Sequence, residues 1–137
     1  MSKLVFIVED NLAQQKMLQV HFEEMLGNYQ VRTFANPEDM FAHLGEKPFA
    51  IVLDHFFADG SKDGLHYLKE LKKGYPSIPV IYYTTANDEV VRAAAMKLGV
   101  AQYIVKDSAS LVRLRTALDL LEVKKSKKGF FKNLFGK

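Results

Sequence analysis

Short apolar runs that end in a polar residue recur along this chain, and they constrain its fold more than any other feature. LVFIV precedes Glu9 and Asp10, AIVL precedes Asp54, VIYY precedes Thr84, and YIV precedes Lys106. Each run is too short for a buried helix and is rich in Val, Ile and Tyr, which is typical of a strand covered on both faces. The chain is therefore predicted to contain a buried parallel sheet.

Helical patterns separate the predicted strands. The strands are expected at residues 3–8, 30–34, 49–53, 79–83 and 101–105. Apolar residues recur at helical spacing in two stripes between them. One stripe comprises Leu12, Leu18, Phe22, Met25 and Leu26, and the other comprises Leu65, Leu68 and Leu71. This alternation predicts an α/β fold in which helices cover both faces of a parallel sheet.

Length and composition indicate one globular domain. The chain has 137 residues, of which 48% are hydrophobic, and it contains no Cys. No apolar run approaches the roughly 20 residues that span a bilayer. The N-terminal residues MSKLVFIVED lack the pattern of a cleavable signal. We therefore expect a cytoplasmic protein.

The polar residues after the strands predict a site for a metal ion and a phosphoryl group. The carboxyl ends of parallel strands line one edge, so three carboxylates, a hydroxyl and an ammonium are expected to converge there. Carboxylates this close repel one another, and a divalent cation relieves the repulsion. Hard oxygen ligands without Cys or His favour Mg²⁺, which commonly also binds phosphate oxygens. One carboxylate can then act as a nucleophile and form an aspartyl phosphate.

This arrangement resembles the receiver domain of two-component response regulators. The resemblance rests on the acidic pair after the first strand, Asp54 after the third, Thr84 after the fourth and Lys106 after the fifth. It covers about residues 1–123 and implies a flavodoxin-like fold, a doubly wound parallel sheet of five βα units in the order 2-1-3-4-5. Since the length leaves no room for a second domain, we expect a stand-alone signalling protein and not an enzyme.

The resemblance assigns a role to each polar residue. Asp54 is expected to accept a phosphoryl group from a histidine kinase or a phosphotransfer protein, and Thr84 and Lys106 to contact that group. Mg²⁺ is the expected cofactor, and its implied ligands are Glu9, Asp10, Asp54 and the backbone carbonyl oxygen of Phe56. Thr84 and Tyr103 are the expected switch: Tyr103 turns inward on phosphorylation, and the surrounding face then binds a downstream protein.

Several residues depart from the usual receiver pattern. The loop HFFADGSKDG after Asp54 is about two residues longer than usual, and Thr85 replaces a small residue. Phe56 and Ala86 are apolar at two positions that in receivers often steer the hydrolytic water. These departures predict a long-lived phosphoryl state.

Other interpretations of the same residues remain open. Any one acid could be a solvated strand end, Thr84 could simply continue its strand, and Lys106 could be a surface lysine. A flavodoxin-like electron carrier is disfavoured because Glu9 and Asp10 would repel the flavin phosphate. A phosphohydrolase would need a second carboxylate where Phe56 stands. A receiver that no longer accepts a phosphoryl group and acts only as a binding module is a further alternative.

The last fourteen residues, 124–137, form a basic amphipathic segment. They contain six of the lysines and no acid, and removing these six charges from the net charge of +3 leaves −3 for the rest. The domain itself is therefore not expected to bind nucleic acid. Phe130, Phe131, Leu134 and Phe135 would share one side of a helix. The segment is expected to contact an anionic membrane surface or an acidic partner helix, or else to remain a mobile tail. Whether the protein forms a homodimer is left open.

Overall fold

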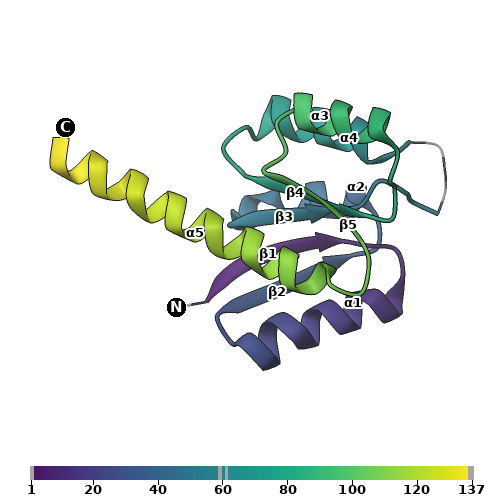
Figure 1. The fold of residues 1–137 in the computed structure, drawn as a ribbon, viewed down its shortest axis with the longest axis horizontal. Coiled ribbons are helices and arrows are strands. Elements are labelled where there is room, and N and C mark those ends of the chain that lie inside the picture. The colour runs from purple at the N-terminus through teal and green to yellow at the C-terminus, as the bar shows by residue number, and fades with distance from the viewer. Residues whose placement is uncertain (1, 59, 61, 136–137) are drawn as a thin grey trace.

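The computed structural model describes residues 2–58, 60 and 62–135 and contains one five-stranded parallel sheet (Figure 1). The strands are β1 Lys3–Val8, β2 Tyr29–Phe34, β3 Ala50–Leu53, β4 Val80–Thr84 and β5 Gln102–Val105. Each strand starts and ends within one residue of its predicted bounds. The strand order is β2-β1-β3-β4-β5, which confirms the predicted flavodoxin-like topology.

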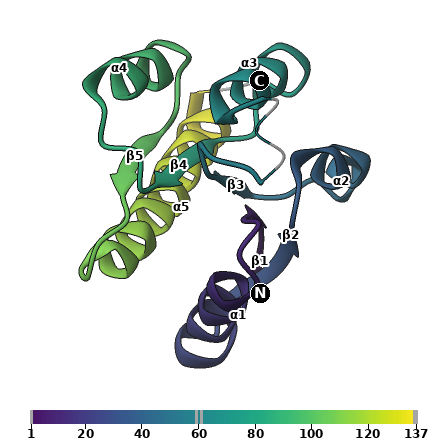
Figure 2. The same cartoon turned by 90° about the vertical axis from the view of Figure 1, so that its right-hand side faces the viewer.

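Helices cover both faces of the sheet, as Figure 2 shows in the view turned by 90°. One face is covered by α1, which continues into a π-helix, η1, and by α5; the other is covered by α2, α3 and α4. The bounds are α1 Leu12–Gln19, η1 Val20–Leu26, α2 Pro37–Ala42, the 3₁₀ helix η2 Leu44–Glu46, α3 Gly64–Gly74, α4 Glu89–Lys97 and α5 Ser110–Phe135.

The strands bury alternate side chains in two separate cores. In β1, Val5 and Ile7 belong to the core beneath α1 and α5, whereas Phe6 and Val8 belong to the core beneath α2, α3 and α4. Successive side chains of a strand point to opposite faces, so a strand covered on both sides must be apolar throughout. This requirement explains the continuous apolar runs in the sequence.

Four residues of the helical stripes are buried, and Leu65 is partly buried. Leu18 and Phe22 are fully buried beneath the sheet, and Leu68 and Leu71 lie in the opposite core. Leu12, however, is 74% exposed, because it is the first residue of α1 and lies at the edge of the sheet. Leu12 therefore shares the helical spacing of the stripe without sharing its burial.

Helix α5 does not stop at the predicted start of the tail. It is continuous from Ser110 to Phe135, and its second half extends beyond the sheet (Figure 1). The basic amphipathic segment is thus the end of a long helix rather than a separate short one. No helix within the described ranges is both long and apolar enough to cross a membrane.

Candidate functional site

The ends of three strands bring two carboxylates and one ammonium together. Val8 of β1 pairs with Leu53 of β3, so the residues that follow them, Glu9 and Asp54, emerge side by side. Lys106, after β5, donates a hydrogen bond from Nζ to Oδ2 of Asp54 at 2.9 Å and another to Oε1 of Glu9. Residues 9, 54 and 106 are far apart in the chain, and the topology alone gathers them.

Backbone amides hold the remaining carboxylate oxygens. Oδ1 of Asp54 accepts from the backbone N–H of His55 at 2.6 Å and of Phe56 at 3.4 Å. Oε2 of Glu9 accepts from the N–H of Asn11 at 3.2 Å. Glu9 is only 4% exposed and Asp54 only 7%. Buried carboxylates require such partners, so their orientation is well defined.

Lys106 keeps its charge in a largely buried position. Burial by itself disfavours the ammonium, but hydrogen bonds to Glu9 and Asp54 and their negative charges outweigh it and raise the pKa of Lys106 above its ordinary value. The side chain is therefore a fixed positive charge at neutral pH. It can attract a phosphate oxygen as readily as a carboxylate.

The donor set suits Mg²⁺ in type, although only two of the three predicted carboxylates meet. Glu9 and Asp54 are hard oxygen donors, whereas Asp10 is exposed. Within the described part of the chain, no three His, Cys, Asp or Glu residues are arranged to hold a metal ion. The expected meeting of three carboxylates thus differs from the observed arrangement, in which the Lys106 ammonium lies between Glu9 and Asp54.

Thr84 and Tyr103 are linked through one backbone segment. Thr84, the last residue of β4, is fully buried, and its Oγ1 accepts from the N–H of Ala86 at 3.2 Å. The hydroxyl of Tyr103 donates to the carbonyl oxygen of Ala86 at 2.7 Å. The ring of Tyr103 stacks on Tyr82 with centroids 5.4 Å apart. Tyr103 therefore already lies inward in this structure, and the segment at Ala86 connects it to Thr84.

Gly64 is a site residue that the sequence reasoning did not single out. Its N–H donates to the carbonyl oxygen of His55 at 2.8 Å. A Cβ at this position would lie 2.2 Å from the backbone oxygen of Asp54 and 2.4 Å from the Tyr82 hydroxyl. Only glycine lets α3 begin so close to Asp54. The Asp-Gly pair at 63–64 was the available signal, since Asp63 caps α3 by accepting from the N–H of His66.

His55 contacts both Asp54 and Tyr82. It is buried, and its Nδ1 lies 2.8 Å from the hydroxyl of Tyr82, whose ring stacks on Tyr103. His55 is therefore bonded to Asp54 through its backbone N–H and connected to Tyr103 only through Tyr82. The sequence had left its role open.

The residues that depart from the usual receiver pattern lie in the segments that follow β3 and β4. The Phe56 side chain is 55% exposed, Thr85 is exposed and Ala86 is buried. In the long loop, Gly60 has a φ of +65° and its N–H donates to the carbonyl oxygen of Phe57, which forms a turn. Two residues of this loop, 59 and 61, lie outside the described residues.

Comparison with known families agrees with the geometry. Residues 5–119 match the model of the response regulator receiver domain. The chain belongs to this family. The receiver is similar to the probable C4-dicarboxylate response regulator DctR of Halalkalibacterium halodurans, with 30% identity over 86% of this chain and 50% of DctR. It is also similar to the methanogenesis regulatory protein FilR1 of Methanothrix harundinacea, with 31% identity over 80% of this chain and 25% of FilR1.

Solved structures share the receiver fold. The phosphorylated cyanobacterial phytochrome response regulator RcpA matches with a TM-score of 0.70 and 24% identity, over 91% of this chain and 92% of RcpA. The Mn²⁺-bound form of response regulator Rcp1 matches with a TM-score of 0.67 and 24% identity, over 90% and 92% of the two chains. The present chain spans half or less of the two curated relatives named above, but nearly the whole of these two structures.

Proposed function

We propose that Asp54 accepts a phosphoryl group from a histidine kinase or phosphotransfer protein of the cytoplasm and relays the signal through protein contacts. The observation that carries this proposal is the Lys106 ammonium bonded to both Glu9 and Asp54 at the carboxyl edge of the sheet. A buried acid–base cluster at the topological switch point of such a sheet is where ligands bind.

Phosphoryl transfer requires one new bond and one broken bond. A carboxylate oxygen of Asp54 forms a bond to phosphorus, and the bond from phosphorus to the donor histidine nitrogen breaks. Asp54 already has its carboxylate fixed by the amides of His55 and Phe56, so little reorganisation is needed. Lys106 can exchange its contact with Asp54 for one with a phosphoryl oxygen.

Mg²⁺ would be held by Glu9, Asp10, Asp54 and the backbone carbonyl of Phe56. When bound, it would neutralise the charge of the phosphoryl oxygens. Glu9 and Asp54 are already together, and Asp10 is adjacent in the chain and exposed. Their oxygens fit the ion in type, so the proposal retains the full set.

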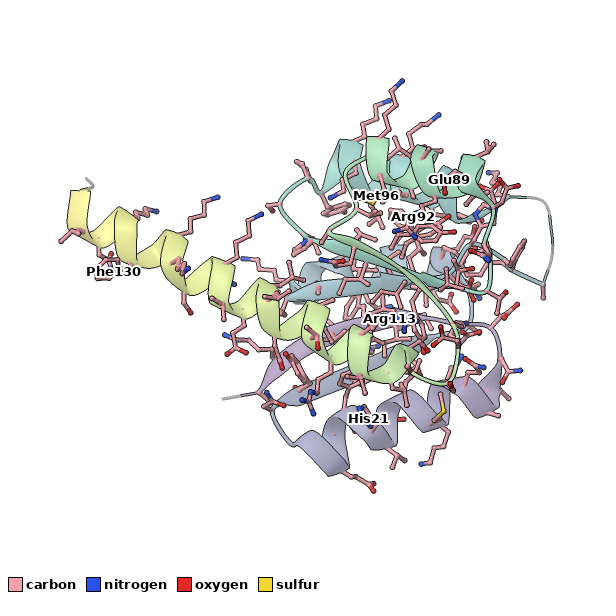
Figure 3. The ribbon with its side chains drawn as sticks, viewed as in Figure 1. His21, Glu89, Arg92, Met96, Arg113 and Phe130 are labelled. Atoms are coloured by element: carbon pink, nitrogen blue, oxygen red, sulfur yellow. The ribbon has the colours of Figure 1, made fainter. Side chains whose placement is uncertain are left out.

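The output would be a change in the equilibrium between conformations of the face formed by α4, β5 and α5. Phosphorylation adds about −1.5 to −2 charges, which would draw in the Thr84 hydroxyl and shift Ala86, to which Tyr103 is bonded. Arg92 of α4 lies over the Tyr103 ring at 5.3 Å. A hollow of about 240 Å³ between β5 and α5 lies beside it and is lined in part by Tyr103 and Arg113. Figure 3 labels Arg92, Met96 and Arg113 on this side of the molecule.

Intact mass spectrometry tests the proposal. The chain is incubated with Mg²⁺ and a small-molecule phosphodonor such as acetyl phosphate, and we expect one added phosphoryl group. Asp54→Asn should remain unmodified, and omission of Mg²⁺ should abolish the gain. An unchanged mass for the wild-type chain would leave a receiver that acts only as a constitutive binding module.

A further inference from the structure

A groove lies at the amino edge of the sheet, at the opposite end from Asp54. It has a volume of about 1290 Å³ and lies between the start of β1, the segments that precede β3 and β4, and the part of α5 that leaves the sheet. Figure 1 shows α5 leaving on the side where the N-terminus lies. The groove is therefore separate from the phosphoryl-acceptor site.

The charged residues that line this groove are all positive. Six lysines line it: Lys3, Lys47, Lys72, Lys124, Lys125 and Lys128. None of the described lining residues carries a carboxylate. The acid nearest in sequence to Lys47, Glu46, pairs instead with Arg32. So many like charges within one groove repel one another unless an anionic partner compensates them.

The floor of the groove is apolar. The buried ring of Phe49 lies beneath it, and the ammonium groups of Lys3 and Lys125 each lie 5.6 Å from the centre of that ring. Tyr75 is 40% exposed, and Ile78 and Leu121 are partly buried. Lysines from four separate segments thus surround aromatic and aliphatic surface, so the groove offers both charge and apolar contact.

The size and the lining distinguish between kinds of occupant. Pockets for small molecules have about 300–1000 Å³, and this groove is larger. A flat membrane surface could meet the exposed end of α5 but not the concave floor around Phe49. An amphipathic peptide helix matches both features, since it places an apolar face in a groove and charged residues at the rim.

We infer that this groove binds an acidic amphipathic segment of a partner protein, with its apolar side on Tyr75 and Leu121 and its carboxylates on the surrounding lysines. This inference goes beyond the phosphoryl relay and does not depend on it. The partner would bind at the end of the domain away from Asp54, so it would leave the phosphorylation edge accessible.

The probe for the test is a synthetic amphipathic peptide made of Leu and Glu at helical spacing, labelled for fluorescence anisotropy. The control peptide has the same composition with the leucines redistributed. We expect the full, unphosphorylated chain to bind the first peptide with micromolar affinity and the second at least about tenfold more weakly. Amide NMR shifts should change at Phe49, Tyr75 and Leu121.

Charge reversals then locate the binding site. Lys3→Glu combined with Lys125→Glu should weaken binding about tenfold or more, with unchanged circular dichroism. Lys132→Glu is the matched control, because Lys132 lies on the same helix beyond the groove. Equal losses in both variants, or NMR shifts confined to residues 129–135, would overturn the inference. So would binding to phosphatidylserine vesicles that depends on Lys3 and Lys125 when the peptide does not bind.

Discussion

Lys106 joins the two buried carboxylates of the site and provides their nearest positive charge. Its Nζ contacts Glu9 and Asp54 at once, and its side chain is only 11% exposed. Removing one partner from a buried cluster leaves the others without compensation, which costs more than the net contribution of the intact cluster. The local stability of the site and its affinity for phosphate oxygens thus depend on the same ammonium.

Lys106→Met should reduce the free energy of unfolding by about 3–5 kcal/mol at pH 7 without Mg²⁺, because Glu9 and Asp54 are left facing each other. Urea denaturation measures the change. Lys97→Met, at an exposed position on α4, is the control and should change stability by less than about 0.5 kcal/mol. An equal loss of unfolding free energy in both variants would show that the buried cluster contributes no more to stability than an exposed lysine does.

A comparison of the wild type with Lys106→Met also predicts how the stability contributed by Lys106 depends on pH. The pKa of Lys106 is raised in the folded protein, since its bonds to Glu9 and Asp54 outweigh the effect of burial. Its stabilising contribution is therefore complete below the unfolded lysine pKa of about 10.4 and is lost as the pH rises through the higher folded value. The stability difference between wild type and Lys106→Met should be constant from pH 7 to about pH 9 and shrink above about pH 10.4. A difference that grows with alkaline pH would contradict this assignment.

Gly64→Ala should damage both folding and phosphorylation. The new methyl would overlap the backbone oxygen of Asp54 and the Tyr82 hydroxyl, and overpacking of this kind costs about 1–3 kcal/mol or more. Thermal unfolding and the extent of phosphorylation at Asp54 measure the two effects. Gly74→Ala is the control: nothing lies within 4 Å of its added Cβ, so it should be neutral or slightly stabilising.

Phe56 and Ala86 are the two apolar residues at the positions expected to steer a hydrolytic water. The Phe56 side chain is exposed beside Asp54 and cannot orient a water molecule by hydrogen bonding. We expect slow loss of the phosphoryl group, and Phe56→Asn should accelerate it by roughly tenfold, a modest effect for a positioned polar group. Decay of the intact-mass signal after removal of the donor measures the rate. Wild-type decay as fast as in the quickest chemotaxis-type receivers would refute the expectation.

At the scale of elements, the sequence predicts strands better than helix ends. Four of the five strands end where an apolar run meets a polar residue, and the structure agrees with the predicted bounds within one residue at every strand end. The π-helix at Val20–Leu26 has no such marker, because its hydrogen-bond pattern does not change which residues are apolar. The strand ends in the sequence predict which residues form the site. The contact of Lys106 with Glu9, in contrast, depends on how β1, β3 and β5 are aligned in space, which the sequence does not show.

The length of α5 was also missed for a physical reason. Residues 124–137 were set apart from the rest of the sequence by their basic composition, which does not show where a helix ends. Like charges three or four residues apart destabilise a helix, and glycine does so by about 1 kcal/mol. The structure instead continues the helix through both features. Its extension is therefore expected to be the least stable part of α5.

Gly129→Ala tests the stability of that extension. No atom lies within 4 Å of a Cβ at this position and its φ is not positive, so the change should favour the helix by about 1 kcal/mol. Amide hydrogen exchange in residues 124–134 should slow, while exchange in the sheet stays the same. Unchanged exchange near Gly129 would mean that the extension is already fully helical or not helical in solution.

At the scale of the molecule, the two ends of the sheet differ in character. The carboxyl edge holds Glu9, Asp54 and Lys106, and the amino edge holds the lysine groove. The extension of α5 borders only the second of these. The proposed phosphoryl acceptor and the inferred site for an acidic partner thus lie at separate ends of one domain.

This separation predicts that a chain ending at Val123 accepts a phosphoryl group as the full chain does. All residues proposed to bind the phosphoryl group or Mg²⁺ precede residue 107, and the last segment lines only the distant groove. The extent and Mg²⁺ dependence of phosphorylation, measured by intact mass, should be the same for both chains. Binding of the acidic peptide, in contrast, should weaken in the shorter chain, which lacks Lys124, Lys125 and Lys128. If phosphorylation failed while the shorter chain kept its circular dichroism and thermal unfolding, the boundary between receiver and extension could not lie at residue 123.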